Sequence, residues 1–188
     1  PVTNTKVGIE TGDPRNFKSY DELYDAFLKQ LHFIIDQKVR VSNYIDRMFA
    51  KYAPATFLSL FIDDCIARGR DYYDCGPRYN STYIQCTGLG TTTDCLSVLK
   101  KHVFEDKKIE MSTLLDAVAK NWEGEEKLRQ FIVNRTPFFG NDDPYADSIA
   151  VKVYDDLVDA IDGKPNTKGG CFRLNMLSTT CHVYFGLV

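Results

Sequence analysis

Cys181 and His182 are adjacent residues whose types match a nucleophile and its general base. They lie in the segment Ser-Thr-Thr-Cys-His, residues 178–182, where a stretch with strand character begins. Because adjacent side chains of a strand point to opposite faces, we do not expect Cys181 and His182 to touch. Thr179 and Cys181 would share one face, and Thr180 and His182 the other. We expect one of these faces to line a pocket.

The carboxylates and the other histidines give weaker signals for catalysis. Asp63 and Asp64 are adjacent on an expected helix, about 100° apart, so they do not converge on one proton or metal ion. His32 is interpreted as a packing or surface residue of a long helix. His102 follows two lysines near a helix end, where a positive charge suits the helix dipole. Four other acidic residues are interpreted as helix caps and turn residues: Asp71, Asp74, Asp142 and Asp143.

The spacing of the glycines and cysteines argues against several common sites. The Gly-Leu-Gly sequence at residues 88–90 lacks the third glycine of a dinucleotide fingerprint and the Lys-Ser/Thr of a P-loop, so we interpret it as a turn before a helix. The 6 cysteines include no Cys-x-x-Cys pair and no nearby histidines at ligand spacing, so no metal site is expected. We expect free thiols in a reducing cytoplasm, with a disulfide-rich secreted module as the alternative.

The composition is that of a folded domain with nearly balanced charge. The chain has 188 residues, with 23 Lys+Arg against 26 Asp+Glu and a formal net charge of −3. This balance gives no electrostatic argument for binding nucleic acid or an anionic membrane. Hydrophobic residues make up 44% of the chain, which is too apolar for intrinsic disorder. The longest apolar stretch, residues 57–62, is too short to span a bilayer.

Helical patterns dominate the chain and separate a few strand candidates. Ser19 and Glu22 form a capping box before a helix over residues 20–50, which must end before Pro54. A strongly apolar helix over residues 56–67, stopped by Gly69, is expected to be buried. Further helices are expected over residues 94–104, with caps at 91–94, and over 112–122, 125–133 and 143–161.

Strands are predicted over residues 82–86, 171–176 and 181–185. Two or three isolated strands do not form a stable sheet without partners. They must therefore pair with one another across long helical segments, or find partners outside this chain. Together with a start that lacks Met and an apolar end, this predicts a helix-rich α/β chain that is an internal piece of a larger protein.

Three segments resemble the glycyl radical enzymes, the pyruvate formate-lyase-like family. Residues 76–80 (Gly-Pro-Arg-Tyr-Asn), followed by the glycine turn at 88–90 and Asp-Cys-Leu-Ser at 94–97, resemble the family's Gly-Gly-x-Arg-Tyr-Asn block. Residues 136–143 resemble its Pro-x-Tyr/Phe-Gly-Asn-Asp block, and residues 179–186 the approach to its Thr-Pro-Asp-Gly-Arg loop. The resemblance covers essentially the whole chain and is greatest to the trans-4-hydroxy-L-proline dehydratases. The departures are four cysteines, namely Cys75, where the family usually has Gly, and Cys86, Cys95 and Cys171.

The resemblance implies that residues 1–188 are an internal segment of a ten-stranded α/β barrel. In such enzymes a radical SAM activating enzyme installs a radical on a glycine, the glycine passes it to a cysteine, and the thiyl abstracts hydrogen from the substrate. A neighbouring glutamate acts as a base in the dehydratases. This chain contains neither the family's Gly-Cys-x-Glu sequence nor its Arg-Val-x-Gly-Tyr sequence, so we expect no catalytic residue in it, no cofactor bound by it and no activity when it is isolated.

The family places the late strand of this chain against the substrate. The resemblance therefore assigns Thr179 as a substrate contact, with Thr180 and His182 as further contacts; a strand hydroxyl bonded to backbone is the alternative for Thr179. The expected whole protein is a cytoplasmic, homo-oligomeric lyase acting on a hydroxyproline-like substrate. The alternatives are a glycerol or diol dehydratase, a formate C-acetyltransferase, or a non-enzymatic split subunit or binding module.

Overall fold

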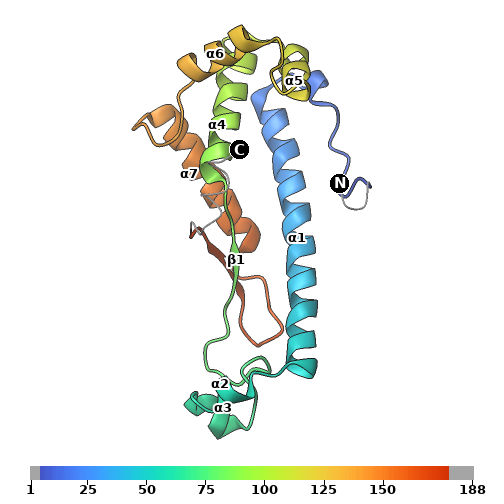
Figure 1. Ribbon diagram of the computed structural model, residues 1–188, viewed down its shortest axis with the longest axis vertical. Helices are drawn as coiled ribbons and strands as arrows, with labels where there is room; N and C mark the ends of the chain where they lie inside the picture. The colour runs from blue at the N-terminus through green and yellow to red at the C-terminus, as the bar shows by residue number, and fades with distance from the viewer. Residues whose placement is uncertain (1–4, 178–188) are drawn as a thin grey trace. The chain divides into compact units, whose positions relative to one another are not determined.

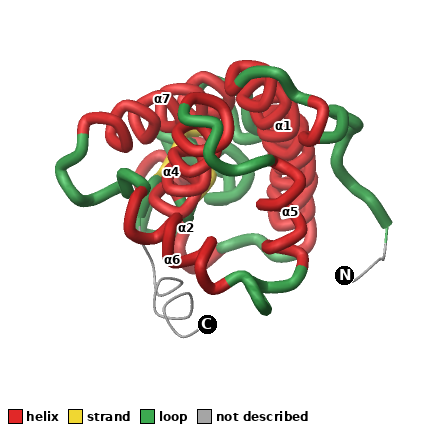
Figure 2. The backbone as a smooth tube through the Cα atoms, turned by 90° about the horizontal axis from the view of Figure 1, so that it is seen from above, coloured by secondary structure: helices red, strands yellow, loops and turns green. Residues whose placement is uncertain are grey.

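The computed structural model describes residues 5–177 of the chain, which separate into two compact units. Unit 1 comprises the described residues up to Leu31 together with Gly88–Asp156. Unit 2 comprises His32–Thr87 and the described residues from Leu157 onward. Helix predominates in the described residues, and the strands are short (Figure 2). This is the helix-rich α/β composition that the sequence predicts.

A single long helix, α1, spans Tyr20–Tyr52 and contributes to both units (Figure 1). Its start follows the predicted capping box, because the Glu22 N–H donates to Ser19 Oγ at 3.2 Å. The Glu22 carboxylate reaches back one residue further than in a standard box and accepts from the Lys18 N–H at 2.7 Å. The predicted helix over residues 20–50 is confirmed.

Unit 1 is helical, and its core lies among α4, η2, α5 and α6. These elements span Leu89–Val98, Leu99–Glu105 (a π-helix), Met111–Ala119 and Glu126–Arg135, after a short 3₁₀ turn, η1, at Pro14–Asn16. The buried cluster consists of Val98, Ile109, Leu114 and Ile132. The seventh helix, α7, spans Pro144–Ile161, and the Asp143 carboxylate caps it by accepting from the Tyr145 N–H at 2.9 Å.

Two helix boundaries in unit 1 differ from the sequence predictions. Residues 91–94 do not cap a helix, because α4 already begins at Leu89, after Gly88 with its left-handed φ of 90°. Asp94 instead accepts from the Phe139 N–H at 2.8 Å. The helix predicted over residues 112–122 ends at Ala119, since Asn121 and Trp122 have φ values of 49° and 64°, which an α-helix does not tolerate.

Unit 2 contains a parallel pair of strands, β1 (Thr82–Gln85) and β2 (Phe172–Asn175). Thr82 pairs with Phe172, and Gln85 pairs with Asn175. The chain between the two strands holds four α-helices and a π-helix, so the strands pair across a long helical segment as the sequence requires. The strand predicted over residues 181–185 lies outside the described residues.

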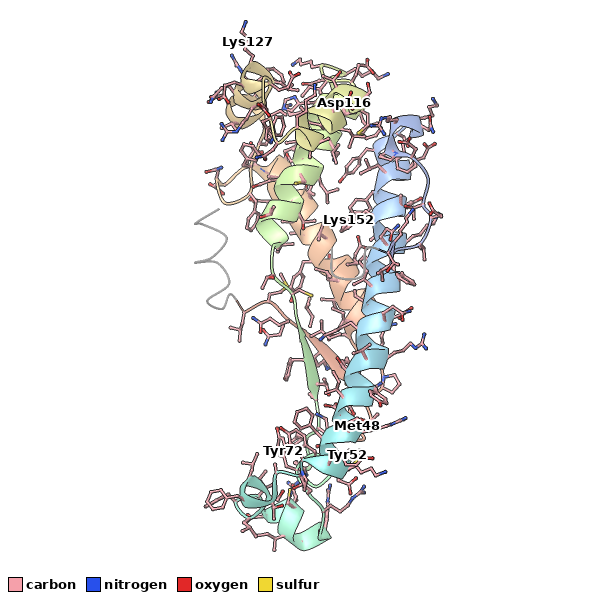
Figure 3. All side chains as sticks on the ribbon, turned by 45° about the vertical axis from the view of Figure 1, so that its right-hand side comes forward. Met48, Tyr52, Tyr72, Asp116, Lys127 and Lys152 are labelled. Carbon is pink, nitrogen blue, oxygen red and sulfur yellow. The ribbon has the colours of Figure 1, made fainter. Side chains whose placement is uncertain are left out.

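The apolar segment before β1 departs most from its prediction. Residues 56–67 form two short helices, α2 (Thr56–Ser59) and α3 (Asp63–Arg68), and they are not buried: Phe57 is 75% and Phe61 71% exposed. Gly69 does terminate α3 in a left-handed conformation, as predicted. Figure 3 shows Met48 and Tyr52 on the last turns of α1 and Tyr72 on the segment that follows α3. No helix among residues 5–177 is long and apolar enough to cross a membrane.

Candidate functional site

The β1–β2 pair of unit 2 has one apolar face and one polar face. Ile84 and Phe172 are buried on the apolar face, with Phe172 completely inaccessible to solvent. Because paired residues of adjacent strands point to the same side, the register gathers four other side chains on the opposite face. These are Tyr83, Gln85, Arg173 and Asn175. The strand pair therefore presents polar groups from two segments about 90 residues apart.

Asn166 holds the two strands together where they begin. Its Nδ2 donates to the Asn80 carbonyl and to Thr82 Oγ1, the latter at 3.0 Å. Its Oδ1 accepts from the Lys168 and Gly170 N–H groups, both at 2.9 Å. One side chain thus shapes the loop before β2 and fastens it to the Gly-Pro-Arg-Tyr-Asn block before β1.

Gly170 is required at this junction because no side chain fits there. A Cβ atom at this position would lie 2.3 Å from the Asn80 carbonyl oxygen, well inside van der Waals contact. The approach is against backbone, which cannot swing away as a side-chain end does. The glycine therefore allows the loop before β2 to approach the end of the residue 76–80 block.

Three contacts attach the loop before β2 to the unit 2 part of α1. Lys164 pairs with Asp36 at 2.6 Å, and Asn43 Nδ2 donates to the Pro165 carbonyl at 3.3 Å. Lys168 pairs with Asp46 at 3.4 Å, and both of these side chains are largely buried. Removing one partner of a largely buried ion pair destabilises a protein more than removing one partner of an exposed pair, because a buried charge is left without its counter-charge. The loop is therefore held at three points along the helix.

Asp162 occupies the outer edge of β2. Its carboxylate accepts from the Leu174 N–H at 2.7 Å and from Arg173 Nη1 at 3.0 Å. The Phe172 N–H donates to the Lys164 carbonyl at 2.7 Å, so the start of this edge is also occupied. The hydrogen bond from Leu174, aided by Arg173 and opposed by burial, holds the pKa of Asp162 below its usual value.

Side-chain amides also hold the chain where β2 ends. Gln85 Nε2 donates to the Leu177 carbonyl at 2.7 Å, and the Leu177 N–H donates to Asn175 Oδ1 at 2.9 Å. The sequence assigned no role to Gln85, Asn175 or Asn166, although Gln85 and Asn166 lie in segments that resemble the family. Gln85 and Asn166 bond residues distant in sequence, which only the folded chain brings near.

The three predicted substrate contacts, Thr179, Thr180 and His182, lie outside the described residues, as does Cys181. Cys86, directly after β1, is a described thiol near this end of the strands. Partial burial raises the pKa of Cys86, which keeps the thiol protonated and makes it a poor nucleophile. The described residues around the strand pair therefore supply hydrogen bonds that hold the chain, and Cys86 is not an activated nucleophile.

Two other sequence candidates do not form a reactive site. Asp64 pairs with Arg78 at 3.2 Å, as a structural carboxylate would. His102 is not a surface cation at a helix end: it is 1% exposed, and burial lowers its pKa. The interpretation from the helix dipole was wrong because the π-helix turns this ring into the core of unit 1, against Phe131. Among residues 5–177 no group of three or more His, Cys, Asp or Glu residues is placed to hold a metal ion.

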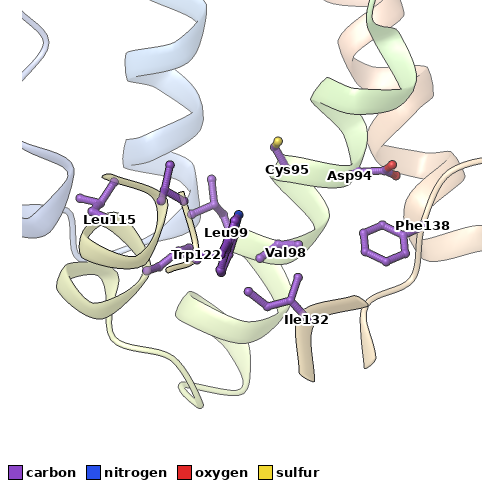
Figure 4. Close-up of a pocket in the computed structure, with 10 residues that line it drawn as sticks. Asp94, Cys95, Val98, Leu99, Leu115, Trp122, Ile132 and Phe138 are labelled. Carbon is purple, nitrogen blue, oxygen red and sulfur yellow. The ribbon is translucent and has the colours of Figure 1, made fainter. Parts of the chain in front are cut away.

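Unit 1 contains an apolar pocket of about 330 Å³ (Figure 4). Val98, Leu114, Trp122, Ile132 and Phe138 contribute to its lining. Asp94 lies at the same pocket, but its carboxylate is engaged by the Phe139 N–H. The pocket surface is apolar, and the Cys95 thiol, whose pKa burial raises, also contributes to its lining.

Comparison with known proteins gives consistent matches along the whole chain. The pyruvate formate lyase-like family matches residues 1–186. The chain is 47% identical to the trans-4-hydroxy-L-proline dehydratase of Clostridioides difficile over 186 residues, covering 99% of the chain and 24% of that enzyme. It is 31% identical to the (2S)-3-sulfopropanediol dehydratase of Klebsiella oxytoca, covering 98% of the chain and 22% of that enzyme.

Solved structures agree with these matches. The Clostridioides difficile hydroxyproline dehydratase with trans-4-hydroxy-L-proline bound superposes with a TM-score of 0.92 at 47% identity, over 99% of this chain and 24% of that one. The B12-independent glycerol dehydratase of Clostridium butyricum superposes with a TM-score of 0.90 at 30% identity. The match covers 97% of this chain and 23% of that one. The chain thus spans about a quarter of the length of these relatives. With this match along its sequence and its fold, the chain belongs to the pyruvate formate lyase-like family.

Proposed function

We propose that the protein containing this chain is a glycyl radical lyase that removes the hydroxyl group of trans-4-hydroxy-L-proline as water. The observation that carries the proposal is the 47% identity to a hydroxyproline dehydratase over 99% of the chain. The TM-score of 0.92 to a substrate-bound structure of such an enzyme supports it further. Identity to the diol and glycerol dehydratases is lower, at 30–32%.

In this proposal, residues 1–188 form an internal segment of the ten-stranded barrel domain. The segment supplies barrel strands and helices, binds no cofactor and is inactive alone. The reacting cysteine and the radical glycine belong to other segments of the whole protein, and a radical SAM activating enzyme generates the radical. The cytoplasmic location and the homo-oligomeric state predicted from the sequence belong to the same proposal.

Thr179 is the proposed main substrate contact of this segment, and Thr180 and His182 are proposed as further contacts. A threonine hydroxyl can donate a hydrogen bond to a substrate carboxylate, whereas a valine of the same shape cannot. We expect Thr179→Val to raise KM for hydroxyproline about 10-fold, the loss of one charge-assisted hydrogen bond, and Thr179→Ser to retain most of the affinity. Equal losses in both variants would assign the threonine to packing instead.

The substrate is tested on the full-length protein, activated anaerobically by its radical SAM enzyme. Hydroxyproline, glycerol and 1,2-propanediol are supplied in parallel, and the loss of each is followed. Loss of hydroxyproline alone is the expected result. Turnover of a diol with no turnover of hydroxyproline would replace the proposed substrate, and no radical signal after activation would refute the enzyme class.

A further inference from the structure

The unit 2 part of α1 carries a narrow stripe of exposed apolar side chains, called here the α1 stripe. It consists of Ile34, Val41, Ile45, Met48 and Tyr52, each at least 39% exposed. At 100° per residue, these five side chains fall within about 60° of the helix circumference. Figure 3 shows the last two of them, Met48 and Tyr52, at the end of the helix. A helix face of this kind is typical of one that packs against another element.

The α1 stripe does not pack within its own unit. Asp36, Asn43 and Asp46, which contact the loop before β2, lie about 180° around the helix from the stripe. One face of α1 therefore holds unit 2 together, and the opposite face carries the stripe. An apolar surface of this kind marks an interaction site.

The spacing of the α1 stripe is that of a coiled-coil seam. Ile34, Val41 and Met48 follow one another at intervals of seven residues. Ile45 and Tyr52 lie four residues after Val41 and Met48, which completes the alternation of four and three that a heptad repeat requires. The corresponding position after Ile34 is Lys38, the one charged residue of the seam. The stripe therefore fits a second helix, and Lys38 requires a negative partner on it, since a buried charge is costly without one.

The charges near the α1 stripe are positive and unpaired. Residues 34–52 contain two acids, Asp36 and Asp46, and both pair with lysines on the opposite face. Among residues 5–177, no ion pair or side-chain hydrogen bond engages the cations of the same stretch, namely Lys38, Arg40, Arg47 and Lys51. A groove of about 510 Å³ is lined by Val41 of the stripe together with Arg40 and Arg47. A partner of this face therefore needs both an apolar seam and negative charge.

We propose that the α1 stripe docks an amphipathic helix of the same full-length protein, from outside residues 1–188, whose apolar seam is bordered by Asp and Glu. The chain spans about a quarter of the length of its relatives, so most of such a protein lies outside it. A helix of the same chain is tethered and has a high effective concentration at the stripe. A second copy of the stripe does not fit, because in either orientation its cations would face those of the first copy with no free acid between them.

Coverage of the stripe does not depend on the substrate of the whole protein. Both experiments below use unactivated protein without substrate. Absence of hydroxyproline turnover would therefore refute the proposed function and leave the docking surface standing. An uncovered stripe in an active hydroxyproline dehydratase would refute the docking surface alone.

Coverage is tested by alkylation of cysteines placed in the stripe. Val41→Cys and Ile45→Cys are made in the full-length protein, treated with iodoacetamide and followed by peptide mass spectrometry. The reference for each variant is its own rate in denaturant. We expect alkylation of the folded protein to be slower by about 10-fold or more, because the thiol reacts only when the docked helix opens. Equal rates in the folded and unfolded protein at both positions would overturn the proposal.

The occupant is identified by cross-linking with a carbodiimide, which couples an amine to a carboxylate in contact with it. Arg40→Lys and Arg47→Lys keep the positive charge and supply the amine. We expect links from these positions to Asp or Glu outside residues 1–188, recovered from the monomer band after denaturing electrophoresis. The matched control is Arg129→Lys on α6, which should link to Glu126, the partner of Arg129 at 3.4 Å.

Two outcomes of the cross-linking would overturn the proposal. Links from residues 40 and 47 that occur only in the dimer band would show that a second copy covers the stripe. Links only to carboxylates within residues 1–188 would show that these cations serve their own segment.

Discussion

The side-chain amide of Asn166 donates a hydrogen bond to the Thr82 hydroxyl at 3.0 Å, joining residues 84 positions apart. The same amide nitrogen donates to the Asn80 carbonyl, and the amide oxygen closes the loop before β2. Asn166 thus lies where both strands of the parallel pair begin. Substitution of this one residue should destabilise the β1–β2 pair at the end where both strands begin.

We expect Asn166→Ala to lower the opening free energy of the β1 and β2 amides by about 2–4 kcal/mol, since several hydrogen bonds are lost and two partly buried partners are left without Asn166. Native-state hydrogen exchange of the full-length protein measures this quantity. Asn134→Ala on exposed α6, which removes bonds only to Gln130, should change its own helix by less than about 0.5 kcal/mol. Similar small effects for both variants would contradict the role of Asn166.

Gly170→Ala should destabilise the same junction for a steric reason. The new Cβ would lie 2.3 Å from the Asn80 carbonyl oxygen, so the loop must shift, at a cost of about 1–3 kcal/mol. Gly8→Ala is the control, because its Cβ would meet the end of the Gln30 side chain at 2.7 Å; that side chain can rotate away at the cost of its hydrogen bonds to Ile9 and Thr11, whereas backbone cannot. Thermal denaturation of the full-length variants compares the two, and equal melting temperatures would refute the prediction.

Asp162 should make the strand pair less stable in acid. The folded state lowers its pKa below the unfolded value, which is about 3.9, so the stabilisation is present above that value. It is lost as the pH falls through the lower, folded pKa. Asp162→Asn removes the charge and should reduce this loss in exchange measurements of β2 between about pH 5 and pH 2.

The control for this titration is Asp159→Asn, which removes an exposed carboxylate of α7 that has no hydrogen bond or ion pair among the described residues. It should leave the pH dependence of β2 unchanged. A wild-type β2 whose protection is independent of pH over the same range would show that the Asp162 charge does not stabilise the edge.

Local sequence patterns predicted the long helices and the two described strands well. Helix α1 has a capping box and an apolar spacing that recurs over many turns, and both signals are local. The prediction of one helix over residues 56–67 was wrong, because contacts with residues outside this segment interrupt the helix. Asp71 accepts from Ser59 Oγ at 2.8 Å and from the Ala55 N–H at 3.2 Å, and an apolar composition does not encode such a break.

The candidate site was predictable only in part. The family resemblance assigned the segment after β2 to the substrate site. Its three expected substrate contacts, Thr179, Thr180 and His182, stay predictions. The roles of Gln85 and Asn166 were not predictable, because each bonds a residue that the parallel register or the loop before β2 brings close. Asn175 bonds Leu177, only two residues away, and no motif marks that local contact. A single polar residue in a strand carries no signal of its own until that pairing is known.

His102 gives the opposite case, in which burial reverses the charge expected from the sequence. Its Nε2 lies 3.0 Å from Thr136 Oγ1, and that hydroxyl donates its own proton to the Ile132 carbonyl at 2.7 Å. The hydroxyl therefore accepts from Nε2–H, which leaves Nδ1 as an unprotonated nitrogen without a partner among the described residues. Burial lowers the pKa of the ring; Asp106 opposes this, and Lys101 and Lys108 add to it.

A lowered folded pKa means that the unfolded chain binds the proton first, at a pKa of about 6.5. Stability from the neutral ring is therefore complete above that pH and declines as the pH falls towards the folded pKa. His102→Leu removes this dependence, so the difference in melting temperature between wild type and variant should narrow from pH 7.5 to pH 5.5. His32→Leu, at an exposed position of α1, is the control and should leave the dependence intact. A difference for His102→Leu that stays constant with pH would mean that the pKa of this ring is the same in the folded and unfolded states.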